Sequence, residues 1–463
     1  MSKTASKTTK PTGKTCCCCG GESIGNIARV ATAIPGPRSA ELLARWKQVE
    51  AETTGYQAAV VWESGKGVVV TDVDGNTFID WTSGVLVTNL GHAHPKLVAA
   101  VQNAAAKLIN NYECPTETRV RAAEAMVKHL PRHLDKVFFL TTGSEAVESC
   151  LRIMKRKTGN FEIIGFEGGF HGRTYAAASI GGLGGPKRKY GPTMPGVIRA
   201  PFPYPYRSPV GGGDAGLIDY CMTRLDDAVR YSSTGALAGI FVEPYQGAAG
   251  FIFPPKGYLT TLEKWCRAKG ILFGLDEVQS SYGRTGTMWA MDWENITPDV
   301  VSIGKGIGNG IPTSAVAAKG EVISCLGRGE MSSTVGGNPV SSAAVSAILE
   351  VMDEEKLVEN SARIGKVIMA RLQRLQEKSR YLGDVRGRGL VMGMELVKDK
   401  KTKEPAADLV KQLIDRCAEN GLLIGSVGIW GNVVRVAPPL CISEAEAQES
   451  CDIMEKSLLS LKK

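Results

Sequence analysis

The sequence of 463 residues lacks several features that would place it in particular classes of protein. No apolar run approaches the ~20 residues of a membrane-spanning helix, so we expect no membrane-embedded segment. The 54 glycines are scattered rather than periodic, and no internal repeat is present, which excludes collagen-like and linker-like proteins. With 43% hydrophobic and 22% charged residues, the composition is that of a globular protein with a large core.

A basic surface suited to nucleic acid is also missing from most of the chain. The formal net charge is +8, but the first twenty residues hold four lysines and no acidic residue (Lys3, Lys7, Lys10 and Lys14). Without these four, 51 of the 55 basic residues remain against 47 acidic residues. The body of the chain is nearly neutral, and a nucleic acid partner is not indicated.

Paired cysteines are scarce outside the N-terminal tail. Residues 1–23 read as a disordered basic tail that contains a run of four cysteines, Cys16–Cys19, for which metal binding, acylation and redox chemistry stay open. The other eight cysteines include no C-x-x-C pair. Because a signal-peptide core is also lacking, we expect reduced thiols and a cytoplasmic protein.

Apolar runs alternate with helical patterns through the middle of the chain. Strands buried on both faces read as continuous apolar, β-branched runs, so this alternation predicts a mainly parallel sheet covered by helices. A helix is expected to start at Ser144 and another to span 258–269. The predicted strands are 136–142, 161–166, 237–244, 271–278, 299–305 and 314–319.

The flanking segments follow other patterns. Before the sheet we predict helices at 38–53 and 95–110 and a hairpin around Asp74-Gly75. After Pro339 we predict a long helix from Ser341 toward Lys378, strands at 390–396 and 433–436, and helices at 405–420 and 443–461. The predicted organisation is an N-terminal segment at 24–85 that joins the small domain, a large α/β domain at 86–338 and a smaller α+β domain at 339–463.

Chemically useful residues follow three of the predicted strands, where ligands of such sheets gather. Gly143 and Ser144 lead into a helix whose free N–H groups can cradle a phosphate. Asp276 ends an apolar strand, where a carboxylate needs a cationic partner. Lys305 enters a Gly-rich loop, where burial can lower its pKa and make it a Schiff-base nucleophile. Taken singly, a helix cap, a structural ion pair and a surface lysine are alternatives.

Seven motifs in a fixed order connect these residues to a known family. They are TGSEA, FHGRT, VEPYQG, DEVQSSYGRTG, SIGKGIGNGIP, TVGGNP and VRVAPPL. From about Pro35 to the C-terminus the chain resembles the class III, or ω-amino-acid, aminotransferases. The resemblance implies the fold type I architecture of transferases that depend on pyridoxal 5′-phosphate (PLP), with a seven-stranded, mainly parallel sheet in the large domain.

The resemblance also implies a role for each matching residue. Lys305 would hold PLP as a Schiff base and carry the proton, and Asp276 would pair with the pyridine nitrogen. Thr334 would reach the phosphate from the partner subunit, which implies a homodimer with shared active sites; further pairing of dimers stays open. The remaining cofactor contacts would be Gly143 and Ser144 at the phosphate, Phe170 and Val278 on the ring faces, Gln279 near the phenolic oxygen, and His171 as a positioning residue.

Implied substrate contacts come from Val85 and from three charged residues. Arg173 would bind the distal carboxylate of 4-aminobutyrate and of glutamate, and Arg435 the α-carboxylate of glutamate or 2-oxoglutarate. Glu243 would cover Arg435 while an ω-amino donor is bound, because carboxylate–guanidinium pairing is bidentate and directional. The implied reaction is a ping-pong transfer from an ω-amino acid, 4-aminobutyrate first, to 2-oxoglutarate. EPYQGAAG departs here from the commoner EP-x-Q-x-E-G-G form, a change that the sequence does not explain.

Other reactions on the same fold stay open. They are amine or ω-amino-acid transamination with pyruvate, amino-acid racemisation, and 2,2-dialkylglycine decarboxylation. The decarboxylase type has Gln, Trp and Met where this chain has Val85, Phe170 and Arg173, which favours transamination. A non-catalytic binding protein would be expected to lose Lys305 or Asp276. No metal site is expected, because His92 and His94 lie in a loop without further ligands and are expected to make structural hydrogen bonds.

Overall fold

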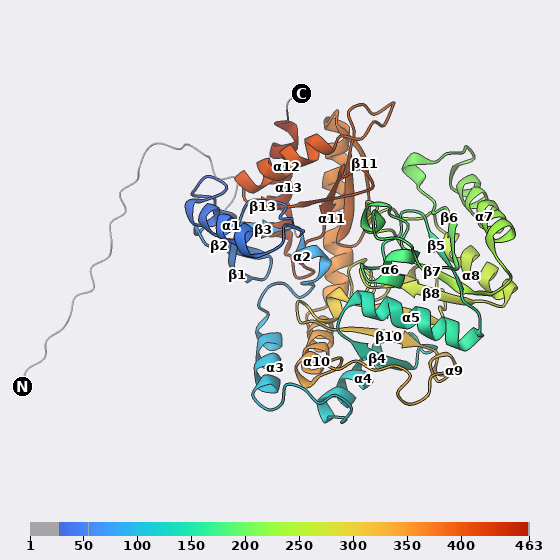
Figure 1. Cartoon of the computed structure of the whole chain (residues 1–463). Coiled ribbons are helices and arrows are strands. Elements are labelled where there is room, and N and C mark those ends of the chain that lie inside the picture. Colours follow the sequence, from blue (N-terminus) through green and yellow to red (C-terminus); the bar gives the residue numbers. More distant parts are fainter. Residues whose placement is uncertain (1–26, 54, 462–463) are drawn as a thin grey trace, which may run out of the picture.

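The computed structural model describes residues 27–53 and 55–461 of the chain. The tail expected at 1–23, with Cys16–Cys19, lies outside the described residues. In Figure 1 a central sheet with helices around it forms one part of the molecule, and elements from both ends of the chain form a second group beside it.

Seven strands form the central sheet in the order β4-β10-β9-β8-β7-β5-β6. Only β10 runs antiparallel to its neighbours, β4 and β9, while the other four pairs are parallel. The predicted mainly parallel, seven-stranded sheet is therefore confirmed. The strands are β4 (Lys136–Leu140), β5 (Glu162–Phe166), β6 (Val197–Ala200), β7 (Leu237–Val242), β8 (Leu272–Asp276), β9 (Val300–Ile303) and β10 (Ser314–Ala318).

The edge strand β6 has no counterpart among the predicted strands. Its four residues alternate between half-buried and buried positions, so it lacks the continuous apolar run that marks the central strands. Helix α5 packs across β7–β10, and α8 packs against β8. The helices around the sheet are α4 (Glu117–His129), α5 (Gly143–Thr158), α6 (Tyr175–Ile180), α7 (Gly213–Ser232), α8 (Tyr258–Lys269) and α9 (Gly320–Ile323).

The second group contains two four-stranded sheets, β1-β2-β3-β13 and β11-β12-β15-β14. Pairing of β13 with β3 joins the two ends of the chain, and the β2–β3 hairpin turns at Asp74-Gly75 as predicted, with Gly75 at a φ of 84°. These strands are β1 (Trp62–Lys66), β2 (Val69–Asp72), β3 (Thr77–Asp80), β11 (Leu382–Arg388), β12 (Val391–Leu396), β13 (Leu422–Leu423), β14 (Gly425–Val427) and β15 (Val433–Val436).

Three predicted helices differ from the structure. The helix predicted from Ser341 to Lys378 is divided, because Lys356 adopts a left-handed conformation (φ 51°) between α10 and α11. Two others, α1 and α3, end about a turn early, where the chain becomes exposed and no longer packs. The helices of this group are α1 (Pro37–Val49), α2 (Ser83–Leu86), α3 (Pro95–Ala105), α10 (Pro339–Glu354), α11 (Leu357–Lys378), α12 (Ala407–Glu419) and α13 (Glu444–Leu459).

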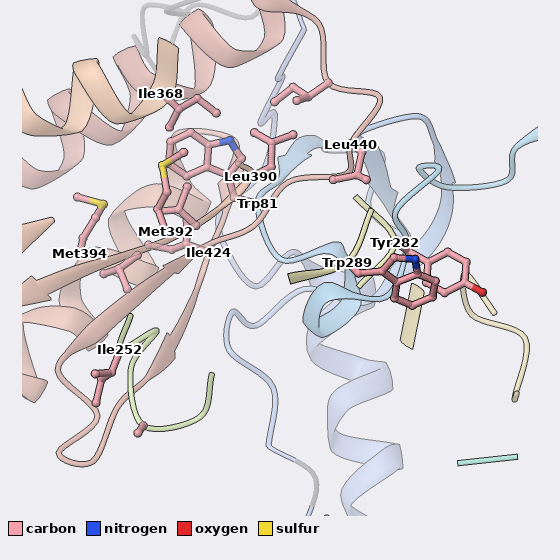
Figure 2. Packing of buried hydrophobic residues seen from close by; sticks show 14 of the residues in the cluster. Trp81, Ile252, Tyr282, Trp289, Ile368, Leu390, Met392, Met394, Ile424 and Leu440 are labelled. Atoms are coloured by element: carbon pink, nitrogen blue, oxygen red, sulfur yellow. The ribbon is translucent and has the colours of Figure 1, made fainter. Parts of the chain in front are cut away.

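A continuous apolar core connects the two groups of elements. Figure 2 shows Trp81 and Leu390 close to Ile368 of α11, and Tyr282 beside Trp289, whose rings meet edge to face at 5.6 Å. Burial of such large side chains is the main term that holds the layers together. No helix in the described ranges has both the length and the hydrophobicity needed to cross a membrane.

Candidate active site

A cavity of about 350 Å³ opens at the carboxyl ends of the central strands. It brings together ten residues that the sequence motifs single out, although these span more than 160 positions of the chain. Those residues are Gly143, Ser144, Phe170, His171, Arg173, Glu243, Asp276, Val278, Gln279 and Lys305. The parallel strands produce this convergence, because their carboxyl ends share one edge of the sheet.

Asp276 lies at the end of β8 and is only 5% exposed. Its Oδ2 lies 2.7 Å from Nδ1 of His171, and its Oδ1 accepts hydrogen bonds from Ser302 Oγ at 2.9 Å and from the Val278 N–H at 3.0 Å. The carboxylate is thereby fixed in the floor of the cavity. His171 thus contacts Asp276 directly, as a positioning residue would.

Lys305 begins the 3₁₀ turn η4 (Lys305–Ile307) just after β9. Its φ of 48° is uncommon for a residue with a side chain and indicates that the surrounding structure imposes this turn. Burial lowers the pKa of the Lys305 amine, while Asp276 and Glu243 act to raise it and Arg435 to lower it. An amine with a lowered pKa is a better nucleophile near neutral pH.

The N-terminus of α5 forms another wall of the cavity. Thr142 and Glu145 form a capping box, but the N–H groups of Gly143 and Ser144 donate to no described residue. A Cβ atom on Gly143 would stand 2.9 Å from Val278 Cγ1, so the helix start lies close against the strand end. Free N–H groups at a helix start are well suited to an anion such as phosphate.

Glu243, just after β7, is 8% exposed and forms no ion pair with a lysine or arginine of the described residues. Its carboxylate accepts hydrogen bonds from the N–H groups of Phe170 at 2.9 Å and Gly247 at 3.1 Å. Burial raises the pKa of Glu243 to about 7; His171 and these N–H groups lower it, and Asp276 raises it. Burial thus favours the neutral form of this carboxyl group more than in an exposed glutamate.

Arg435, on β15, is 5% exposed. Within the described residues its guanidinium makes no hydrogen bond or ion pair, its Nε is buried without an acceptor, and burial lowers its pKa to about 10. The contact expected between Glu243 and Arg435 is therefore not formed in this structure, because backbone N–H groups hold the glutamate. A buried cation without a partner is unfavourable unless a ligand supplies the anion.

Arg173 is exposed and lines the cavity, with its guanidinium carbon 5.4 Å from the centre of the Phe170 ring. Three further predicted residues, Arg435, Thr334 and Val85, are not among the residues that line the cavity. Thr334 is exposed in the loop before α10. Val85 is 47% exposed and has a φ of 71°, in a turn whose residues from Ser83 to Leu86 all have positive φ.

Some contributing residues have no place among the sequence predictions, and three of them bear on the chemistry of the site. Ser302 binds Asp276 across the β8–β9 pair, and a serine within an otherwise apolar strand is the signal that could have identified it. Tyr245 and Ala248 line the cavity. Both lie in EPYQGAAG, where Ala248 takes the place of the glutamate of the commoner form.

The two histidines of the GHAHP segment make hydrogen bonds, as expected. His92 Nε2 lies 3.0 Å from Asp80 Oδ2, and His94 Nε2 lies 2.9 Å from Glu355 Oε1. No group of three or more metal-ligating side chains occurs in the described part of the chain, and its eight cysteines are free thiols.

The chemistry of the cavity fits the cofactor that the sequence resemblance implies. Oε1 of Gln279 is buried with no hydrogen-bond partner among the described residues, as expected of a group that contacts a ligand. The free N–H groups of α5 suit the phosphate of PLP. The buried carboxylate of Asp276 suits a protonated ring nitrogen, and the amine of Lys305 suits an aldehyde.

Comparisons with known proteins agree with this geometry. The sequence model of the family "Aminotransferase class-III" matches residues 51–458. The alanine/serine racemase of Pyrococcus horikoshii is 36% identical over 92% of this chain and 91% of its own length. The 4-aminobutyrate aminotransferase of Mycobacterium leprae is 34% identical over 94% and 99%.

Solved structures that superimpose on this one are also described as aminotransferases. An amine transaminase from an uncultivated Pseudomonas species, solved in its PLP-bound form, superimposes with a TM-score of 0.84 at 27% identity and covers 89% of this chain and 98% of its own. A family match over most of the length, a sheet of the expected topology and a cavity suited to PLP lead to one conclusion: the chain belongs to the class III aminotransferases and is a PLP-dependent enzyme.

Proposed function

We propose that this enzyme transfers the amino group of an ω-amino acid, 4-aminobutyrate first, to 2-oxoglutarate in two separate half-reactions. The observation that carries the proposal is a pair of arginines of different character, one in the cavity wall and one close enough to Lys305 to lower the pKa of its amine. Arg435 is buried and has no partner among the described residues, whereas Arg173 is exposed at the cavity wall. Two receptors for carboxylates suit a dicarboxylate acceptor and a donor with one remote carboxylate.

When bound, PLP supplies an electron-withdrawing ring and an aldehyde that takes up and releases the amino group. The residues of this chain would orient the reactants and move protons. Lys305 would bind the aldehyde through its amine and then carry the proton at the reacting carbon. Asp276, fixed by His171 and Ser302, would hold a positive charge on the ring nitrogen. The Lys305→Ala and Asp276→Asn variants considered in the Discussion test these roles.

The other site residues would bind and enclose the cofactor. Gly143 and Ser144 would donate to the phosphate, Gln279 would contact the phenolic oxygen, and Phe170 and Val278 would pack on the two faces of the ring. All five line the cavity, which supports the assignment. Close packing on both faces would exclude water from the reacting atoms.

We also propose that the enzyme is a homodimer. Thr334 is exposed and does not line the cavity of its own chain, which supports a role in the site of a second subunit. Analytical ultracentrifugation gives the oligomeric state. Mixing a Thr334→Ala subunit with a Lys305→Ala subunit tests the sharing, because a mixed dimer then carries one site with both defects and one with neither.

A second candidate is a reaction on an α-amino acid, such as alanine transamination or racemisation. The absence of an acidic partner for Arg435 favours it, since an unshielded guanidinium accepts an α-carboxylate in every half-reaction. Ala248, at the position of the usual glutamate, brings no carboxylate to the cavity. The high identity to an alanine/serine racemase is also consistent with this candidate.

A donor and acceptor panel tests the two candidates. Single-turnover absorbance would be followed with 4-aminobutyrate, 5-aminovalerate, L-alanine and D-alanine, and then with 2-oxoglutarate, pyruvate and glyoxylate. The proposal expects 4-aminobutyrate to be the best donor and 2-oxoglutarate the best acceptor. Equal use of both alanine enantiomers, with conversion of one into the other in the absence of a keto acid, would instead identify a racemase.

A further inference from the structure

Arg284, in the SYGRTG segment after β8, is a fully buried arginine without an acidic partner among the described residues. Its guanidinium donates to four neutral acceptors: Leu390 O at 2.9 Å, Pro438 O at 2.5 Å, Asn89 Oδ1 at 2.7 Å and Ser83 Oγ at 3.4 Å. Burial lowers its pKa to about 10, so it stays charged at neutral pH.

A buried guanidinium that binds only neutral oxygens is costly, because hydrogen bonds to dipoles offset its desolvation less than a carboxylate does. A purely structural contact at this place could be made by apolar side chains at lower cost. What the guanidinium adds is the ability to join several backbone segments in one fixed geometry, through five donors in a rigid fork. The identity of those segments therefore matters.

The first segment leads to the turn of Lys305. Asn89, which accepts from Arg284, donates its amide to Tyr282 O at 2.8 Å and lies against Gly306, where a Cβ atom would stand 2.6 Å from Asn89 Nδ2. The next residue, Leu90, donates to Asn309 Oδ1 at 2.8 Å, at the far end of the same turn. The strained φ of Lys305 is thus enclosed by groups that Arg284 orients.

The second segment carries Val85. Ser83 Oγ accepts weakly from Arg284 and donates to Ala437 O at 2.6 Å. This bond anchors the start of the turn in which Ser83, Gly84, Val85 and Leu86 all have positive φ. Four such residues in succession need an external anchor, because only glycine adopts this conformation without strain.

The third segment extends from Arg435. Pro438, whose carbonyl binds Arg284, lies three residues after Arg435, and Ala437 between them donates its N–H to Trp81 O at 2.8 Å. One guanidinium is therefore connected to three turns or strands: to that of Lys305 through Asn89, to that of Val85 through Ser83, and to that of Arg435 through the Pro438 carbonyl.

We infer that Arg284 is a positioning residue that holds the Lys305 turn, the Val85 turn and the end of the Arg435 strand in mutual register. The inference rests on the roles of Lys305 and Arg435 in the proposed function. Arg284 touches neither cofactor nor substrate and acts through Asn89, Ser83 and the Pro438 carbonyl. Lysine cannot replace it, because one ammonium group does not reach these four acceptors.

The first experiment measures local dynamics and does not depend on the reaction. Hydrogen–deuterium exchange of full-length Arg284→Lys protein, with and without PLP, should speed up at least about tenfold in peptides covering 83–91, 305–309 and 435–440. Arg199→Lys is the matched control: Arg199 also binds backbone carbonyls, those of Ser179 and Ile180, away from these segments. The inference is overturned if exchange becomes uniformly faster in both variants. It is also overturned if exchange in these three peptides of Arg284→Lys is no faster than in the wild type.

The second experiment measures the site. In Arg284→Lys, the pH midpoint of the visible absorbance of bound PLP should shift by about 0.5 unit or more, and KM for dicarboxylates should rise more than kcat falls. A simple loss of fold stability would reduce the active fraction and leave both quantities unchanged. Arg199→Lys should leave both unchanged. The inference fails if Arg284→Lys behaves like Arg199→Lys.

A third variant covers the case in which Arg284→Lys does not fold. Asn89→Ala removes the connection to Lys305 and keeps Arg284, so it should change exchange at 305–309 and the absorbance midpoint but not exchange at 435–440. If both variants fold, their effects on the midpoint should be less than additive, because they act through one contact. If borohydride attached PLP to another lysine, the proposed function would be refuted. The exchange results would still test separately whether Arg284 holds these segments in place.

Discussion

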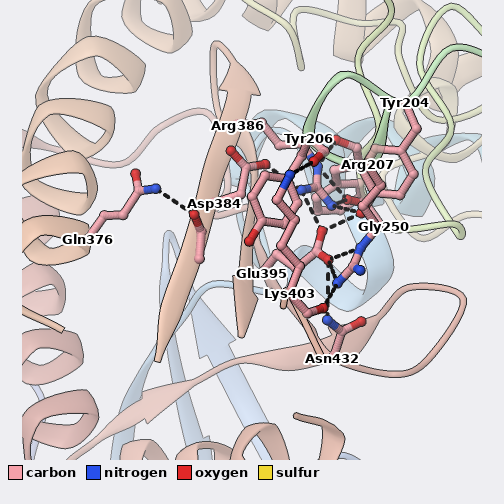
Figure 3. A network of polar contacts seen from close by, with 12 residues as sticks. Tyr204, Tyr206, Arg207, Gly250, Gln376, Asp384, Arg386, Glu395, Lys403 and Asn432 are labelled. Carbon is pink, nitrogen blue, oxygen red and sulfur yellow. Dashed lines mark hydrogen bonds and ion pairs between the residues drawn. The ribbon is translucent and has the colours of Figure 1, made fainter. Parts of the chain in front are cut away.

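Two buried clusters of charge in this protein are built in opposite ways. In the cluster shown in Figure 3, Glu395 accepts from Arg207 Nε at 2.7 Å, from Arg386 Nη1 at 2.8 Å and from the hydroxyl of Tyr204. Burial alone would raise the pKa of Glu395, but these partners outweigh it and lower the pKa. The two carboxylates and two guanidinium groups of this cluster, those of Glu395, Asp384, Arg207 and Arg386, all form ion pairs.

At the active site, by contrast, comparably buried groups lack a counter-charge. Glu243 and Arg435 do not pair with each other, and burial shifts the pKa of each toward its neutral form, to about 7 and about 10. A network in which the charges are paired stabilises the fold. Buried charges without a partner destabilise it, and they can gain a favourable interaction when a ligand of opposite charge binds. The comparison explains why a count of buried ions cannot locate a site, whereas their lack of partners can.

The largest expected effect is at Lys305. Lys305→Ala should abolish transamination, because no other lysine of the described residues lines the cavity, while PLP should still bind without a covalent bond. Borohydride reduction of the wild type should attach PLP to the peptide that contains Lys305. Lys319→Ala is the control, since Lys319 also follows a strand of the sheet but binds Asp299 at 2.6 Å. Labelling of a different peptide would contradict the assignment.

Asp276→Asn should slow turnover about a hundredfold or more, because an amide cannot stabilise the charge on the ring nitrogen; this equals at least about 3 kcal/mol in the barrier. Thermal unfolding should change much less. Asp299→Asn is the matched control: Asp299 is equally buried but binds Arg267 and Lys319, so its loss should lower stability and not turnover per folded enzyme. If Asp299→Asn instead slowed turnover and Asp276→Asn mainly lowered stability, the catalytic carboxylate would not be Asp276.

The two arginines should have separable effects. Arg435→Ala should reduce kcat/KM for glutamate and 2-oxoglutarate some thirty- to a hundredfold, which corresponds to about 2–3 kcal/mol of lost transition-state stabilisation. The effect on kcat/KM for 4-aminobutyrate should be small. Arg173→Met should damage both half-reactions, since each substrate has a distal carboxylate. Single-turnover absorbance with each substrate measures the halves separately. Unchanged 4-aminobutyrate turnover in Arg173→Met would favour the α-amino acid candidate.

In the paired cluster, Glu395→Gln should lower the free energy of unfolding by about 2 kcal/mol and leave kcat per folded enzyme unchanged, because Arg207 and Arg386 lose their counter-charge. The pKa of Glu395 is lowered in the folded state, so its contribution is present at neutral pH and is lost on acidification below about pH 4.5. In urea denaturation at several pH values, the free energy of unfolding of the variant should fall less steeply toward acid pH than that of the wild type. A larger change in kcat than in stability would contradict this separation.

The smallest expected effect is at Glu243. Burial raises the pKa of Glu243 from its ordinary value near 4.5 to about 7, so the folded state holds an extra proton between these pH values. Stability from this group is therefore present below about pH 4.5 and is lost as the pH rises through about 7. Glu243→Gln should remove this slope, on the order of 1 kcal/mol per pH unit, in urea denaturation of the PLP-free protein. An unchanged slope would mean that Glu243 is ionised throughout.

Sequence patterns predicted the central strands well because each is a short apolar run between helices, and they failed where that signal is weak. β6 is short and half-buried, and the break at Lys356 depends on a left-handed residue that no glycine or proline marks. At the site, motifs predicted which residues meet at the sheet edge, since topology brings strand ends together. They did not predict that Glu243 is bound by Phe170 and Gly247 instead of Arg435.

The amino-acid sequence by itself determined the family, the mainly parallel sheet and the chemical groups gathered at its edge. These depend on residue types, local order and the period of apolar runs, all of which are local properties of a chain. Only the tertiary structure decided which charges have partners, because pairing depends on distances between segments such as those of Arg284 and Asn89, nearly 200 residues apart. Desolvation is likewise a property of the packed molecule, and it is desolvation that distinguishes the unpaired Arg435 from an ordinary surface arginine.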